Sequence, residues 1–277
     1  MATTDIYHVS GTLTPARKAI RFVGGNSDDY LQVNAAAVAR TAANDAVGTF
    51  SAWIMIANLT ETFCIVCAGD DNAVEFIELN VEAGLLTARC TDATIAQFVT
   101  QADNIELKAH QWYHVAAVQN ADSFGVKLYV NGVKIASTND TATDVNEWFN
   151  NCDGIDTMRI GGANKTGDAL VINEFKGYIS DVKYWSTALT EAQVLNDYKG
   201  VSTAAASLQN HWDMDDDYVD AGLGADNGTA VSDILLCNNA SEFSSRLCFM
   251  TGVPVVADTV LFSISGNQGH AIVIQAA

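Results

Sequence analysis

Two consecutive segments in the middle of the chain constrain its fold more than any other feature. Residues 112–118 read Trp-Tyr-His-Val-Ala-Ala-Val and are apolar on both sides of a strand alternation, as in a strand with other layers on both faces. Residues 126–135 follow, with the pair Asn131-Gly132 near their centre. Asn-Gly supplies the two positive φ angles of a type I′ turn, so the segment predicts a β-hairpin. On this prediction, five apolar side chains share one buried face: Val126, Leu128, Val130, Val133 and Ile135.

Short strand-like runs separated by turn clusters extend on both sides of this hairpin, from residue 20 to residue 183. The turn clusters include residues 24–29 and 150–154, which are rich in Gly, Asn and Asp. This rhythm is typical of an antiparallel sandwich, and not of strands that alternate with helices. We therefore predict an all-β core that contains six particular side chains: Trp53, Trp112, Val115, Leu128, Ile160 and Ile179.

One short helix is predicted at about residues 191–199. Thr190 has the chemistry of an N-cap, and Gln193 stands where it completes a capping box. Leu189 and Val194 have the spacing of a hydrophobic staple, and Gly200 lies just past the expected end.

Several motifs occur in a fixed order along the chain: Ile-Arg-Phe at 20–22, Asp-Tyr-Leu-Gln-Val at 29–33, Phe-Ser-Ala-Trp-Ile at 50–54, Trp-Tyr-His-Val-Ala at 112–116, Leu-Tyr-Val-Asn-Gly-Val at 128–133, Met-Arg-Ile-Gly-Gly at 158–162 and the strand-like run 175–185. In this order they resemble the laminin-G-like and pentraxin-like domains of the concanavalin A-like lectin/glucanase superfamily. The resemblance implies a jelly-roll sandwich of two antiparallel sheets with one short helix.

The chain divides into three parts on this interpretation. Residues 1–19 are small and polar and are interpreted as an N-terminal arm, and residues 20–218 form the jelly roll. Residues 219–277 are a C-terminal β extension, in which the apolar runs 260–262 and 272–274 predict a second hairpin. An isolated hairpin is marginally stable, so we expect this hairpin and the arm to dock against neighbouring subunits.

Charge and hydropathy exclude two classes of partner. Asp and Glu outnumber Lys and Arg by 33 to 14, which gives a net charge of −19 that repels nucleic acid and anionic lipid. No stretch reaches the ~18 consecutive apolar residues that a membrane span needs. We also expect no cleaved secretory signal, because no apolar run follows the first residues. The sequence therefore predicts no nucleic-acid partner and no membrane insertion.

Six cysteines are scattered without the spacing of a disulfide framework, so we expect mostly buried free thiols. Cys64 and Cys67 have the spacing of a redox pair, but they lie in an apolar β run. Because successive strand residues alternate between faces, we expect these two thiols to point apart. A metal or redox site is not predicted there.

The resemblance implies a calcium site. Asp71 and Asn72 match by position the Asp-Asn calcium pair of pentraxins. The second ligand cluster of that family is replaced by residues 163–168, in which only Asn164 and Asp168 supply suitable oxygens. Residues 213–217 begin like an EF-hand loop, but Tyr218 and Gly224 replace its required glycine and glutamate. If calcium is a cofactor, these four residues are the predicted ligands: Asp71, Asn72, Asn164 and Asp168.

Sugar recognition on such sandwiches needs amide or carboxylate groups on loops and an aromatic face for the ring. The candidates that look exposed are Asn72, Asn120, Trp148, Phe149 and Asn164, each of which also fits a plain loop residue. The related glycosidases carry a Glu-x-Asp-x-Glu strand, whereas residues 78–82 here read Glu-Leu-Asn-Val-Glu. None of the histidines stands in a nucleophile motif, and His114 is interpreted as a core imidazole bonded to a neighbouring turn. No enzymatic activity is predicted.

Three functions are compatible with these features. The first is a non-enzymatic structural or adhesion protein on the surface of a virion, of the capsid-decoration or fibre type found in tailed bacteriophages and made in the host cytoplasm. Its partners would be copies of itself or a capsid shell protein, together with cell-surface glycans. The second is a cellular glycan-binding module at the cell surface or outside the cell. The third is a glycoside hydrolase with an unrecognised motif.

Overall fold

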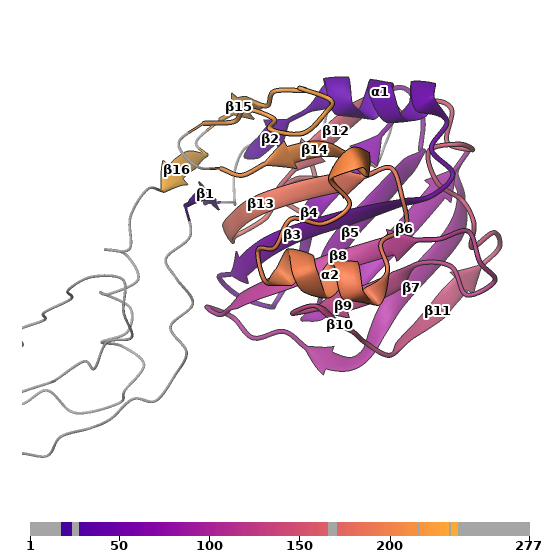
Figure 1. Cartoon of the computed structure of the whole chain (residues 1–277), viewed down its shortest axis with the longest axis horizontal. Coiled ribbons are helices and arrows are strands. Elements are labelled where there is room, and N and C mark those ends of the chain that lie inside the picture. Colours follow the sequence, from indigo (N-terminus) through magenta and orange to yellow (C-terminus); the bar gives the residue numbers. More distant parts are fainter. Residues whose placement is uncertain (1–17, 24–27, 166–170, 215–216, 233, 238–277) are drawn as a thin grey trace, which may run out of the picture. The chain divides into compact units, whose positions relative to one another are not determined.

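The computed structural model describes residues 18–23, 28–165, 171–214, 217–232 and 234–237. Their strands form two antiparallel sheets that share one hydrophobic core, which confirms the predicted jelly-roll sandwich (Figure 1). Sheet A contains β1 (Ala19–Phe22), β3 (Gly48–Ile56), β8 (Trp112–Gln119), β9 (Lys127–Val130), β10 (Val133–Lys134), β13 (Gly177–Trp185), β14 (Leu208–Trp212) and β16 (Leu235–Cys237). Sheet B contains β2 (Tyr30–Gln32), β4 (Thr62–Gly69), β5 (Phe76–Glu82), β6 (Leu85–Asp92), β7 (Ile95–Glu106), β11 (Ser137–Ala142), β12 (Thr157–Ile160) and β15 (Thr229–Val231).

Neighbouring strands in each sheet are often distant in sequence. Sheet A has the order β10-β9-β8-β3-β13-β1-β16, and β14 also pairs with β13. Sheet B has the order β11-β7-β6-β5-β4-β12-β2-β15. Strand β8, which was predicted to have other layers on both faces, lies between β9 and β3 and is buried along its whole length.

The Asn-Gly hairpin is confirmed. Asn131 and Gly132 have φ angles of 51° and 76°, and Val130 pairs with Val133 across the turn. The prediction of one buried face is wrong only for Val133, which is 62% exposed. Strand β10 has two residues and forms the edge of sheet A, so nothing covers Val133 within the described residues.

All six predicted core side chains are buried, but only Val115, Leu128, Ile160 and Ile179 belong to the cluster between the sheets. Trp53 instead packs against His114 and Tyr198 on the other face of sheet A, and Trp112 packs near Tyr178. Alternation along each strand sends one set of apolar side chains into the space between the sheets. A smaller apolar cluster lies on the opposite face of sheet A, where Val194 of α2 (Glu191–Tyr198) and Leu189, just before the helix, cover it (Figure 1).

The helix α2 was predicted and a second helix was not. The side chain of Thr190 accepts the N–H of Gln193 and the side chain of Gln193 accepts the N–H of Thr190, so the capping box is formed. The missed helix is α1 (Asn34–Ala43), and the short 3-10 helix η1 (Ala205–Ser207) precedes β14. Six of the ten residues of α1 are alanine, the residue with the highest helix propensity, and this signal was available in the sequence. Neither helix is long and apolar enough to span a membrane, within the described part of the chain.

Strand β13 changes partners halfway along its length. Its first residues pair with β1, and residues 182–185 pair with β14. Asp181 lies at the change, with a φ of 53° and a shift of register against β3. This β-bulge turns the Asp181 side chain toward β14, where it contacts His211.

The sheets extend beyond residue 218, since β15 pairs with β2 and β16 pairs with β1. Residues 1–17 of the predicted arm and the predicted hairpin within 258–277 lie outside the described residues. The proposed division of the chain at residues 19 and 218 therefore stays a prediction.

Candidate functional site

The outer face of sheet B carries polar side chains in two cross-strand rows. In the first row Arg159, Cys67, Glu78 and Arg89 are consecutive partners on β12, β4, β5 and β6. In the neighbouring row Asn80 is opposite Thr87, whose hydroxyl oxygen accepts an N–H of the Gln101 side chain at 3.1 Å. Because every second residue of a strand faces the same side, the sequence alternation places this polar set opposite the core.

The charges in these rows are paired. Lys165, from the segment that follows β12, contacts the carboxylate of Glu78, and Arg89 contacts Glu82. The side-chain amide of Asn80, in the second row, donates a hydrogen bond to Glu78 Oε2 in the first row, at 2.7 Å. Arg159, Glu78, Asn80 and Thr87 are buried, so the rows are largely covered, and they carry little net charge although the protein as a whole is strongly acidic.

A groove lies at the beginning of β4. It has a volume of about 490 Å³ and lies between residues 61–62 and the segment 171–176. The N–H of Cys64 donates to the carbonyl oxygen of Asn173 at 2.7 Å, which fixes that segment against β4. Lys176 Nζ lies 2.7 Å from Glu61 Oε2 on the wall of the groove. The groove is lined by Glu61, Thr62, Val171, Ile172, Asn173, Glu174 and Lys176.

The sequence offered no sign of this groove. Its two walls are more than 100 residues apart in the chain, as the separation of 115 between Glu61 and Lys176 shows. Of its polar residues only Lys176 belongs to a motif, the run 175–185, and that motif carries no sign of the opposite wall. Only the fold brings them together.

At the other end of β4, the structure brings two of the predicted calcium and sugar ligands together. The side-chain amide of Asn164 donates to Asp71 Oδ1 at 2.6 Å and to Thr157 Oγ1 at 3.2 Å. Asn72 is exposed on the same loop, and its backbone N–H donates to Asp70 Oδ1 at 2.7 Å. Asp168 lies outside the described residues.

These residues do not fit a calcium ion as they stand. The group of Asn164 that faces Asp71 is an N–H donor, whereas calcium takes oxygen ligands. The guanidinium of Arg159 lies 3.6 Å from the same Asp71 oxygen, so the positive charge of this side chain already lies beside the carboxylate. No group of three or more His, Cys, Asp or Glu side chains is arranged for a metal in the part of the chain that the structure describes.

Two expected sugar contacts are buried, so the expectation that they are exposed is wrong. Trp148 is 1% exposed, and its indole N–H donates to the hydroxyl of Tyr184 at 3.3 Å. Phe149 is also in the core, where both rings pack against Phe50. A turn rich in Asn and Gly follows them in the sequence, which made both look like loop residues.

The other two amide candidates differ in exposure. Asn164 is fully buried, and this part of its prediction is also wrong. Asn120 lies on the turn between β8 and β9, where its amide donates to Asp122 at 2.7 Å. Since β8 belongs to sheet A, Asn120 is not part of the polar rows of sheet B.

Cys64 and Cys67 lie on the same face of β4, contrary to the expectation that they point apart. Both pack with Phe76 and Ala163 on the outer side of sheet B. A shift of register between Cys64 and Val66 accounts for this, because an extra residue in a strand restores the face after three positions. Both thiols are buried.

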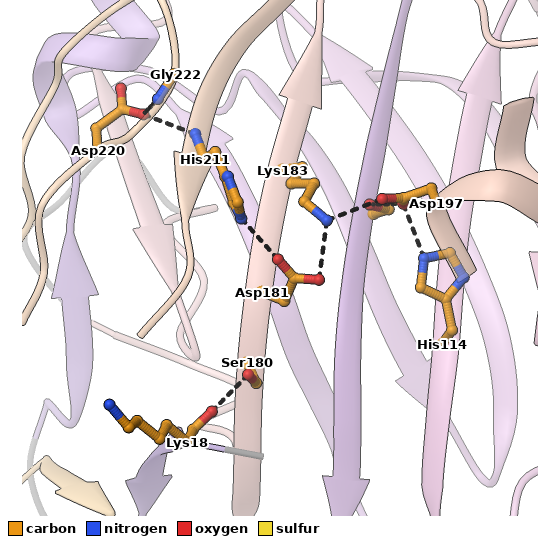
Figure 2. Close-up of polar contacts among 10 residues, drawn as sticks. Lys18, His114, Ser180, Asp181, Lys183, Asp197, His211, Asp220 and Gly222 are labelled. Carbon is orange, nitrogen blue, oxygen red and sulfur yellow. Dashed lines mark hydrogen bonds and ion pairs between the residues drawn. The ribbon is translucent and has the colours of Figure 1, made fainter. Parts of the chain in front are cut away.

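The outer face of sheet A carries a second polar cluster, which Figure 2 shows. Asp197 of α2 reaches the sheet, where its carboxylate lies 2.9 Å from His114 Nε2 and 2.9 Å from Lys183 Nζ. Lys183 also donates to Asp181 at 2.8 Å, and Asp181 lies 2.7 Å from His211 Nε2. The imidazole of His114 is thus buried as predicted, but its partner is the helix α2 and not a turn.

Electrostatics hold Asp181, Asp197 and Lys183 of this cluster in their charged forms. Burial alone would raise the pKa of Asp181, but the hydrogen bond from His211 and the charge of Lys183 outweigh it and hold this pKa far below its usual range. Burial is likewise outweighed at Asp197, where His114 and Lys183 lower the pKa of the carboxyl. Burial would lower the pKa of Lys183, but the charges of Asp197 and Asp181 raise it. The cluster therefore fastens α2 to the sheet, and it leaves no open carboxylate or amine for chemistry.

Solved structures share this fold. The CBM40 module of the Ruminococcus gnavus IT-sialidase aligns with a TM-score of 0.54 and 16% identity over 66% of this chain and 97% of that module. The same module has been solved bound to α2,3-sialyllactose, with 15% identity. A Bacteroides ovatus protein proposed to bind carbohydrate aligns with a TM-score of 0.50 and 22% identity over 80% of this chain, which spans 59% of that protein's length. Identities at this level show a common fold alone.

The sequence itself assigns the family. No curated protein matches the chain. A family model described as the concanavalin A-like lectin/glucanases superfamily, of the laminin G type, matches residues 24–195, which is more than half of the chain. This match, together with the two antiparallel sheets, confirms the resemblance inferred from the motifs. The chain belongs to the concanavalin A-like lectin/glucanases superfamily.

Proposed function

We propose that this protein is a non-enzymatic glycan-binding module, and that the groove beside β4 receives the sugar. The observation that carries the proposal is the composition of the groove. Its volume of about 490 Å³ is in the range of small-ligand sites, and five of its seven lining residues have polar or charged side chains. Carboxylate, amide and ammonium groups are suited to the hydroxyl groups of a sugar ring.

Membership of a lectin and glucanase superfamily supports the proposal. So does the fold shared with a module that has been solved bound to sialyllactose.

A glycan array followed by titration calorimetry tests the proposal. Glu61→Gln keeps the shape of the groove and removes one charge, so we expect it to weaken binding of a captured glycan about tenfold, as expected for loss of one charge-assisted hydrogen bond. The matched control is Glu106→Gln, because Glu106 and Lys108 form an exposed pair of the same 2.7 Å length away from the groove. Equal losses in the two variants, or no captured glycan, would contradict the assignment.

The absence of catalysis is part of the proposal. The carboxylate of Glu78 is 1% exposed and in contact with Lys165, and Asn80 occupies the middle of the strand motif. This row thus provides no pair of open carboxylates for acid and nucleophile roles. Incubation of the protein with a bound glycan, followed by chromatography, is expected to show no release of sugars. Turnover that disappears in Glu78→Gln would identify a glycosidase instead.

We also propose that the module is displayed on a virion, of the kind made by tailed bacteriophages. The support is the apolar runs 260–262 and 272–274, which need a partner surface in water. Deletion of residues 258–277 should reduce self-association by light scattering and incorporation into particles. If the deleted protein assembles fully, the cellular glycan-binding module becomes the better assignment.

A further inference from the structure

Two cysteine side chains meet in the core of the sandwich. Cys90 is on β6 and faces inward, and Cys152 is on the segment between Trp148 and Ile155 that closes one end of the core. Their sulfur atoms lie 3.6 Å apart, and both residues are fully buried. They are 62 residues apart in the chain, so only the fold brings them together.

We propose that Cys90 and Cys152 form a disulfide when the chain folds in an oxidising environment. A disulfide bond is about 2.05 Å long, so the sulfurs have to approach by roughly 1.5 Å. The segment that carries Cys152 is a series of turns without strand pairing, and a small shift of a turn is less costly than a shift of a paired strand. The cross-link would tie β6 of sheet B to the segment that begins with the buried Trp148.

The reaction needs a disulfide oxidant, for which oxidised glutathione serves. The thiolate of one cysteine attacks the oxidant, breaks its S–S bond and releases one reduced glutathione. The second cysteine thiolate attacks the resulting mixed disulfide, forms the Cys90–Cys152 bond and releases the second glutathione. The two thiol protons and two electrons leave with the two reduced glutathione molecules.

The environment of the pair determines when this occurs. The hydrogen bond with Cys152 and burial both raise the pKa of the Cys90 thiol well above its ordinary value. The thiolate is therefore rare in the folded protein, and glutathione has no access to the buried sulfurs. We expect the bond to form during folding or local opening and then to be protected from reduction.

Cys64 and Cys67 provide an internal control. The side chains of Cys64 and Cys67 hydrogen-bond to each other, so these thiols are neighbours as well, but a bond between them has to move a paired strand. The bulge in β4 brings the two thiols to one face, but both residues remain in paired strand. We therefore expect this pair to stay reduced under conditions that oxidise Cys90 and Cys152.

The test is to refold the full-length protein with dithiothreitol in one sample and with a mixture of reduced and oxidised glutathione in another. After alkylation, non-reducing digestion and mass spectrometry should identify a peptide pair joined at Cys90 and Cys152. The thiol count in denaturant should fall by two. Because the closed loop is long, the Tm of the oxidised protein should be higher by on the order of 5–10 °C.

Variants separate the pair from the other thiols. Cys152→Ser should abolish both the cross-linked peptide and the rise in Tm, and the double variant Cys64→Ala, Cys67→Ala should retain both. Cys90→Ala serves as a second variant if Cys152→Ser folds poorly, with circular dichroism as the check on folding. The proposal fails if folded, oxidised protein contains no 90–152 peptide, or if the rise in Tm persists in Cys152→Ser. It is independent of the proposed glycan binding.

Discussion

The outer faces of the two sheets differ in what packs against them. On sheet A the helix α2 lies across the face, and Asp197 reaches from the helix to His114 and Lys183 (Figure 2). On sheet B, among the described residues, Ala163 and Ile172 pack on the corresponding face against Phe76 and the two cysteines of β4, and a groove lies at the beginning of β4. Both faces contain buried charges, so burial of charge alone does not distinguish a structural surface from a binding surface. The difference is whether an open volume lies beside the paired charges, as it does beside Glu61 and Lys176.

Removal of Asp197 should cause the largest loss of stability among these changes. Asp197→Ala leaves Lys183 and His114 buried without their shared partner, and breaking a buried ion pair on one side typically costs about 3–5 kcal/mol. Urea unfolding measures the loss. The control is Asp122→Ala, which breaks a surface pair with Lys127 and should cost less than about 1 kcal/mol. Similar losses in the two variants would show that the sheet A cluster does not fasten the helix.

The second-largest effect should come from acid, which weakens the sheet A cluster. The pKa values of Asp181 and Asp197 are lower in the folded state, so their contribution is complete above the ordinary value of 3.8 and is lost as the pH falls below it. The pKa of Lys183 is raised, so its contribution is complete below 10.5 and is lost as the pH rises above that value. The cluster therefore stabilises the fold between these limits.

The pH dependence can be measured by urea midpoints from pH 3 to pH 7 in the wild type and in Asp181→Asn. Burial raises the pKa of Asp45, Glu75 and Glu147, and these groups oppose the acid effect in both proteins. We expect the variant to lose on the order of 1–2 kcal/mol less stability than the wild type over this range. Parallel curves would mean that Asp181 is not a stabilising carboxylate.

The helix cap gives a smaller and more local effect. Thr190→Ala removes the side chain that accepts the N–H of Gln193, and loss of such a cap costs about 1 kcal/mol. Hydrogen exchange should show faster exchange in residues 191–198 and no change in β5 and β6. Changes spread over both sheets would indicate that α2 is not a separable cover.

Calcium should have the smallest effect. Asp71 is already engaged by an N–H of Asn164 and lies beside Arg159, so millimolar calcium is expected to leave the Tm unchanged. A clear rise that disappears in Asp71→Asn would show that these side chains rearrange around the ion. It would also place a cation next to the polar rows of sheet B.

Local signals in the sequence predicted local structure well. The Asn131-Gly132 turn and the Thr190 capping box depend on residues within four positions of one another, and both are formed. The features that were missed depend on distant partners. Trp148 looked exposed because its neighbours in sequence are polar, but Phe50 and Tyr184 bury it.

The errors on sheet B have a related cause. One extra residue in β4 put Cys64 and Cys67 on the same face, and strict alternation could not foresee it. The groove joins residues 61–62 to residues 171–176, which no motif connects. Patterning thus predicted the two layers, the hairpin and the capped helix, whereas the site required the strand register and the path of one crossing segment.

The pairing of β1 with β16 has a mechanical consequence. Ala19 is opposite Cys237, so the first residue of one strand lies beside the last residue of the other. A pull applied at these two points acts across the pair and separates its hydrogen bonds one after another, in the manner of a zipper. Shear, which loads all the bonds of a strand together, does not arise in this geometry. Tension between these two residues would therefore open the edge of sheet A at low force, while the polar rows and the groove of sheet B, in the other sheet, would remain folded.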